Sequence, residues 1–113
     1  MKSYTINSET KTVEEVNIEG DTLEFAQKAV GGRICSAYVL ENGDTFYCDD
    51  EGLLKPWQYA FEVDGADQPF IGNGIVMGCD EETGDTADVK TSLEDIKKLL
   101  LFFNAKELYM RYA

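Results

Sequence analysis

The sequence predicts a single α+β domain in which a small antiparallel or mixed sheet of about five strands, in the order ββαβββα, packs against two helices. Two observations predict this class. Five segments are rich in alternating, β-branched or aromatic residues, and two others repeat apolar residues every three to four positions behind a capping residue. A chain of 113 residues with 43% hydrophobic residues can bury one core, so residues 1–113 are predicted to form one domain.

The first two predicted elements are the strands of a β-hairpin. Residues 2–7 and 12–18 alternate loosely between apolar and polar side chains, and the polar residues 8–11 lie between them. Tyr4 and Ile6 are the apolar residues of the first strand. This alternation indicates that one side of the hairpin is buried.

A helix is predicted over about residues 22–30. Asp21 can cap its first turn, with Glu24 three residues later completing a capping box. Gly31 and Gly32 follow and supply a left-handed C-cap. The apolar residues form a stripe wide enough to lie on a sheet, and they are Leu23, Phe25, Ala26, Ala29 and Val30.

The pair Asn42-Gly43 between two strand-like segments predicts a second hairpin with a two-residue type I′ turn. In the register that this turn imposes, one side faces the core, with Cys35, Ala37, Val39, Phe46 and Cys48. Cys35 and Cys48 are then diagonal neighbours. The three cysteines, which include Cys79, are predicted to be free thiols in a reducing cytosol.

Residues 49–68 are rich in turn-forming residues and are predicted to be irregular. Within this segment Trp57, Tyr59 and Phe61 recur at every second position. This spacing fits either a short strand with one aromatic side or a loop anchored on the core. Residues 70–77 predict a central strand, because they combine apolar residues with glycines that allow close backbone approach.

A final helix is predicted after residue 91. Either Thr91 with Glu94 or Ser92 with Asp95 can form its capping box. Its apolar residues give a stripe facing the core, composed of Leu93, Ile96, Leu99, Leu100 and Phe103.

If the helical periodicity of about 100° per residue continues through the segment 91–113, a second apolar stripe lies on the opposite face of the helix. One helix cannot bury two faces on one sheet. Either Asn104 ends the helix and a second helix folds back, or the stripe packs against another copy in a homodimer, which we favour. The residues of this predicted oligomer face are Leu101, Ala105, Leu108, Tyr109 and Tyr112.

The chain is strongly acidic, with a net charge of −12. This charge repels nucleic acid and anionic lipid and favours a basic protein partner, although acidity is also typical of proteins that only need to stay soluble. Two clusters are candidate protein-binding sites: Asp49, Asp50 and Glu51, and Asp80, Glu81, Glu82, Asp85 and Asp88. The second cluster lacks the ligand order of an EF-hand, so a solvated acidic turn is predicted there rather than a metal site.

The chain contains no histidine, which excludes histidine-based acid–base catalysis, Ser–His and Cys–His triads and most zinc sites. No catalytic residue stands out, and we predict no enzymatic activity, no metal and no cofactor. No signal peptide or membrane-spanning apolar run is present, which predicts a cytoplasmic protein.

Four motifs, in this order along the chain, resemble those of the domain of unknown function 3846 family: residues 20–24 (GDTLE), 30–34 (VGGRI), 47–52 (YCDDEG) and 71–78 (IGNGIVMG). The resemblance extends from Met1 to about Phe103. It implies a small protein of a phage, plasmid or integrative element without an established enzymatic activity. It implies no particular functional residue.

Together, the resemblance and the charge lead us to expect a non-enzymatic accessory protein that binds and inhibits a basic host protein, such as a defence nuclease or its nucleoprotein complex. DNA mimicry, as in anti-restriction and anti-CRISPR proteins, is one form of this hypothesis. The alternatives are a small-ligand or nucleotide-binding sponge and another regulatory or scaffolding module. A sponge would stack a base on one of three aromatic residues, Trp57, Tyr59 or Phe61.

Overall fold

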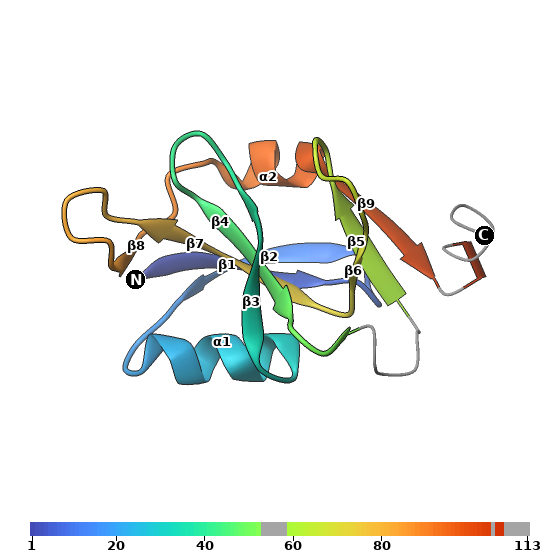
Figure 1. Cartoon of the computed structure of the whole chain (residues 1–113), viewed down its shortest axis with the longest axis horizontal. Helices are drawn as coiled ribbons and strands as arrows, with labels where there is room; N and C mark the ends of the chain where they lie inside the picture. The colour runs from blue at the N-terminus through green and yellow to red at the C-terminus, as the bar shows by residue number, and fades with distance from the viewer. Residues whose placement is uncertain (53–58, 105, 108–113) are drawn as a thin grey trace.

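The computed structural model describes residues 1–52, 59–104 and 106–107, and these residues form three layers (Figure 1). Helix α1 covers one face of a six-stranded antiparallel sheet, and helix α2 with a three-stranded antiparallel sheet covers the other. The larger sheet has the order β2-β1-β7-β4-β3, with β8 also paired to β7, and the smaller sheet has the order β6-β5-β9. The elements are β1 (Lys2–Asn7), β2 (Thr12–Asn17), α1 (Thr22–Val30), β3 (Ile34–Val39), β4 (Thr45–Asp49), β5 (Tyr59–Val63), β6 (Phe70–Ile71), β7 (Gly74–Cys79), β8 (Thr86–Ala87), α2 (Leu93–Leu99) and β9 (Leu100–Asn104).

The predicted α+β class is confirmed, but the strands divide between two sheets. The segment 70–77, predicted as one strand, contributes β6 to the smaller sheet and β7 to the larger sheet. Gly72 lies between them at φ 87°, a left-handed conformation that glycine adopts without strain. Strand β7 is central, as predicted, because it pairs with β1 on one side and β4 on the other.

Helix α1 has the predicted bounds, N-cap residue and C-cap glycine, but the Glu24 carboxylate forms an ion pair with Lys28 (3.2 Å) and does not complete the predicted capping box. The Asp21 side chain accepts a hydrogen bond from the backbone N–H of Glu24 (3.1 Å), and Gly31 ends the helix at φ 84°. The predicted stripe is wrong at Leu23, which is 55% exposed, because the helix contacts the sheet along a narrower face. That face consists of Phe25, Ala26, Ala29 and Val30.

The turn between β3 and β4 has three residues instead of the predicted two. The backbone N–H of Leu40 donates to the carbonyl oxygen of Asp44 (2.8 Å), and the N–H of Gly43 donates to the carbonyl oxygen of Leu40 (3.0 Å). Gly43 has φ 92°, so the turn is of type I and is followed by a left-handed glycine. The predicted type I′ turn is therefore wrong, and the strand pairing shifts by one residue.

This shift changes which side chains of the hairpin face the core. Val39 is 56% exposed, whereas the prediction placed it in the core opposite Phe46. A bulge at Ala37 then restores the phase, so that Cys35 lies directly opposite Cys48 and not diagonal to it. Phe46 and Cys48 are buried as predicted, on the face of the sheet that packs against the smaller sheet.

The final helix is shorter than predicted. Ser92 caps α2 by accepting a hydrogen bond from the backbone N–H of Asp95 (3.2 Å), which is one of the two predicted caps, and the helix ends at Leu99. Residues 100–104, predicted to be helical, form β9 and pair with β5. Their run of large apolar side chains favours a strand, and the pairing satisfies backbone groups of β5.

A buried carboxylate joins the β3–β4 turn to the segment before α2. Asp44 is fully buried, and its side chain accepts hydrogen bonds from the backbone N–H groups of Lys90 (3.0 Å) and Thr91 (2.7 Å) and from the Thr91 hydroxyl group. The carbonyl oxygen of Thr91 accepts a hydrogen bond from the Tyr4 hydroxyl group (2.7 Å). These contacts fix the point at which α2 begins.

Replacing Asp44 by alanine is expected to lower the free energy of unfolding by about 3 kcal/mol, because three partly buried donors on Lys90 and Thr91 would lose their acceptor. Asp44→Asn keeps the side-chain volume but has one acceptor oxygen, so its loss should be smaller. Urea denaturation followed by circular dichroism measures both. The control is Asp67→Ala at an exposed position, with an expected change within about 0.5 kcal/mol. A loss below about 1 kcal/mol for Asp44→Ala would contradict this role.

Candidate functional site

The two acidic clusters predicted from the sequence lie at opposite ends of the larger sheet. Strands β4 and β7 are antiparallel neighbours, with Thr45 opposite Met77. Residues 49–51 therefore lie at the end of β4 that is beside the start of β7, whereas Asp80 directly follows the other end of β7. The two clusters do not form one continuous surface.

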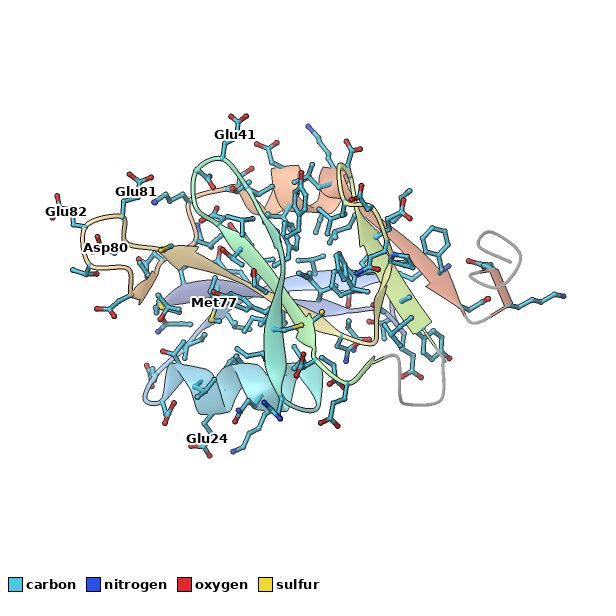
Figure 2. The ribbon with its side chains drawn as sticks, viewed as in Figure 1. Glu24, Glu41, Met77, Asp80, Glu81 and Glu82 are labelled. Carbon is cyan, nitrogen blue, oxygen red and sulfur yellow. The ribbon has the colours of Figure 1, made fainter. Side chains whose placement is uncertain are left out.

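The second cluster lies beside the β3–β4 turn. The ammonium group of Lys90 donates hydrogen bonds to the carbonyl oxygens of Asn42 and Cys79, each at 3.1 Å, and so holds this turn beside the β7–β8 connection. Figure 2 shows Glu41, which the sequence analysis did not single out, at the same end of the molecule as residues 80–82. This exposed surface is termed the acidic end, and its carboxylates belong to Glu41, Asp80, Glu81, Glu82 and Asp85.

Hydrogen bonds within the β7–β8 hairpin fix the shape of the acidic end. The Asp80 carboxylate accepts from the backbone N–H groups of Glu82 (2.9 Å) and Thr83 (3.4 Å), and the Asp80 N–H donates to the carbonyl oxygen of Asp85 (2.8 Å). Asp80 thus stabilises the turn. The side chains of Glu81, Glu82 and Asp85 are exposed, and within the described residues none of them forms an ion pair.

Other carboxylates of the predicted clusters contribute to the fold. Asp88 accepts a hydrogen bond from the backbone N–H of Lys2 (3.0 Å) and so joins the end of β8 to β1. Asp49 is half-buried and accepts a hydrogen bond from the backbone N–H of Glu51 (2.9 Å), which stabilises the turn after β4. Asp50 and Glu51 are exposed, so the first cluster presents two exposed carboxylates.

The predicted aromatic contact surface is divided between the core and the surface. Phe61 on β5 is fully buried, and its ring centre lies 5.5 Å from that of Phe70. Tyr59 is half-buried at the start of the same strand, and Trp57 lies outside the described residues. Phe61 is therefore a core residue and cannot stack on a ligand.

Neither a metal centre nor a membrane-spanning helix is found in residues 1–52, 59–104 and 106–107. No three cysteine, aspartate or glutamate side chains in these segments are grouped so that they could hold a metal ion. No helix there is long and apolar enough to cross a lipid bilayer.

The glycine-rich motif of β7 has a steric explanation. A Cβ atom at Gly78 would overlap the carbonyl oxygen of Asp88, and one at Gly74 would lie 2.7 Å from the ring of Phe61.

The sequence pattern of the domain of unknown function 3846 (DUF3846) matches residues 1–101, which include this glycine-rich motif of β7. The chain belongs to this family. No curated protein and no solved structure matches the chain.

The predicted oligomer face of this DUF3846 domain does not begin on a helix. Leu101 lies on β9 opposite Glu62, and its side chain is 54% exposed. The helical stripe is therefore wrong at this position, because the strand turns Leu101 away from the core and buries its neighbour Leu100. The homodimer stays a prediction, and the other residues of this face lie outside the described residues, namely Ala105, Leu108, Tyr109 and Tyr112.

Adjacent leucines on β9 test this arrangement. Leu100→Glu should lower the free energy of unfolding by at least about 3 kcal/mol, because it places a carboxylate in the core, whereas Leu101→Glu should cost less than about 1 kcal/mol. Urea denaturation measures both changes. Equal losses for the two variants would contradict the strand. Light scattering of the Leu101→Glu variant and its parent shows in addition whether this exposed leucine contributes to a dimer.

Proposed function

We propose that this DUF3846 domain is a non-enzymatic accessory protein of a phage or other mobile element that binds and inhibits a basic host defence protein in the host cytoplasm. The observation that supports it is the clustering of Glu41, Glu81 and Glu82, all exposed, on two adjacent turns. In the sharper form of the proposal, these carboxylates occupy a nuclease cleft in place of DNA phosphates. Such a cleft is lined with lysine and arginine.

Charge gives the acidic end its selectivity. The chain has a net charge of −12. The positive charge of Lys90 also lies at the acidic end, where its ammonium group donates hydrogen bonds to two carbonyl oxygens. The negative electrostatic field of the domain accelerates its association with a basic surface, and this field weakens as the salt concentration rises. It also repels nucleic acid, so the domain is expected not to bind DNA itself.

The hydrogen bonds of the acidic end favour tight binding. Asp80 forms hydrogen bonds within its hairpin, and Lys90 forms hydrogen bonds that connect the two turns. These contacts hold the backbone of the carboxylate-bearing residues in place in the unbound domain. Less conformational freedom is then lost on association. The exposed glutamate side chains are therefore presented to a partner from fixed backbone positions.

The nucleotide-sponge alternative has less support. Phe61, one of its three candidate stacking residues, is buried in the core. The hollow beside β8 is lined by one ammonium group, that of Lys90, and by four carboxylates, so its net charge would repel phosphate groups. The acidic residues are Asp80, Glu81, Glu82 and Asp88. A scaffolding role would use the same acidic end without inhibiting its partner, so an inhibition assay separates the two.

Charge reversal at the acidic end tests the proposal. The variant Glu41→Lys/Glu81→Lys/Glu82→Lys should capture its host partner from lysate at least about tenfold more weakly than the parent, because the attraction becomes repulsion. Immobilised domain is incubated with lysate at low salt and at about 0.5 M salt, which screens surface charges. Captured proteins are identified by mass spectrometry, and the nuclease activity of the captured partner is then assayed with and without the domain.

The matched control is Glu9→Lys/Glu14→Lys/Glu51→Lys, at exposed positions of which Glu9 and Glu51 lie at the opposite end of the larger sheet. Each triple variant changes the net charge from −12 to −6, since each substitution adds two charges. The control should keep most of the binding. Equal weakening of both variants would show that only the total charge matters. Unchanged binding and inhibition by the acidic-end variant would overturn the proposal.

A further inference from the structure

Two cysteine side chains lie against each other on neighbouring strands. Cys35 on β3 and Cys48 on β4 are directly opposite in the antiparallel register, and their Sγ atoms are 3.6 Å apart. Both are free thiols, as is Cys79, which lies at the other end of the sheet, beside the acidic end. The pair is therefore separate from the surface to which the function is assigned above.

The bulge in β3 creates this pair. The three-residue turn places Val39 opposite Thr45, and uninterrupted pairing from there would put Ser36 opposite Cys48. Cys35 would then point to the opposite face, because side chains alternate along a strand. The extra residue in the bulge brings Cys35 opposite Cys48 on the same face.

We infer that Cys35 and Cys48 form a reversible cross-strand disulfide when the domain meets a low-molecular-weight disulfide such as oxidised glutathione. Opposed residues of an antiparallel pair have Cα atoms about 4.5–5.5 Å apart, which lies inside the range of about 4.4–6.8 Å that a disulfide spans. The sulfur atoms must approach from 3.6 Å to about 2.05 Å. Rotation of the two short side chains provides this movement without displacing the strands.

The two thiols differ in accessibility, which sets the order of the reaction. Cys35 is half-buried and can be reached by an oxidant, whereas Cys48 is buried. Burial, and then the adjacent Cys35, raise the pKa of the Cys48 thiol to about 12. A cavity of about 180 Å³ opens beside both residues and is also lined by Asp49 and Phe70. Cys35 therefore reacts first, and Cys48 closes the bond.

The thiol–disulfide exchange between the two cysteines and oxidised glutathione takes place in two steps. The thiolate of Cys35 attacks one sulfur atom of oxidised glutathione, forms a mixed disulfide and releases one glutathione thiolate. Cys48 then gives up its proton to solvent and attacks the Cys35 sulfur, which releases the second glutathione thiolate. The protein dithiol is oxidised by two electrons, and oxidised glutathione is reduced to two glutathione molecules. The same steps in reverse reduce the disulfide.

The test is incubation of the full chain with mixtures of oxidised and reduced glutathione, followed by acid quenching and alkylation under denaturing conditions. The expected product carries one alkyl group instead of three, has no attached glutathione and yields a peptide linking Cys35 to Cys48. Because closure is intramolecular, the yield should not depend on protein concentration. Circular dichroism should show that the fold is retained.

Two variants distinguish this pair from an unspecific reaction. Cys79→Ser should close as the parent does, and Cys35→Ser should accumulate no internal disulfide. A persistent glutathione adduct on Cys35, a linkage that involves Cys79, or three alkylatable thiols after equilibration with excess oxidised glutathione would each overturn the inference. The assay requires no partner, so its result is independent of the binding experiment at the acidic end.

Discussion

The burial of one carboxylate determines how the parts of this DUF3846 domain fit together. Asp44 is removed from water, which is costly for a charged group unless hydrogen-bond donors surround it, and Lys90 and Thr91 supply these donors. The contact connects the β3–β4 turn to the start of α2. It also places the Lys90 ammonium group between the carbonyl oxygens of Asn42 and Cys79. The acidic end therefore rests on the same interaction that anchors the last helix.

The layered arrangement limits where this protein can make contacts. Helix α1 covers one face of the larger sheet, and the smaller sheet with α2 covers the other, so the broad apolar faces are used by the core. The turns at the ends of the strands are left accessible. Among them, the β7–β8 hairpin and the β3–β4 turn concentrate exposed carboxylates. A surface of turns on which carboxylates outnumber the one ammonium group of Lys90 is suited to recognising a basic partner by electrostatic complementarity.

The two ends of β4 have different chemistry. One end adjoins the turn that bears Glu41, next to the acidic hairpin, and the other contains Cys48, opposite Cys35. The buried middle of β4 separates the two ends, and Phe46 in this part of the strand is fully buried. The carboxylates of the acidic end and the thiol pair can therefore be altered independently. This separation lets substitutions at either end be interpreted without reference to the other.

Local sequence determined the elements whose geometry depends on neighbouring residues. Asp21 and Gly31 specify both ends of α1, because capping requires only a few adjacent groups. For α2 the local sequence offered either Thr91 or Ser92 as the cap, and Ser92 takes this role while Thr91 binds Asp44. The acidic residues 80–88 likewise predict an exposed turn, which the structure has over residues 80–85, whereas Thr86–Ala87 form β8. Tertiary structure decided what depends on distant partners. Pairing with β5 turned Leu100–Asn104 into a strand, and burial of Asp44 accompanied the shift in the β3–β4 register. Glu41 joined the acidic end for the same reason, since it lies about 40 residues from Glu81 in the chain and only the contacts of Lys90 bring the two turns together.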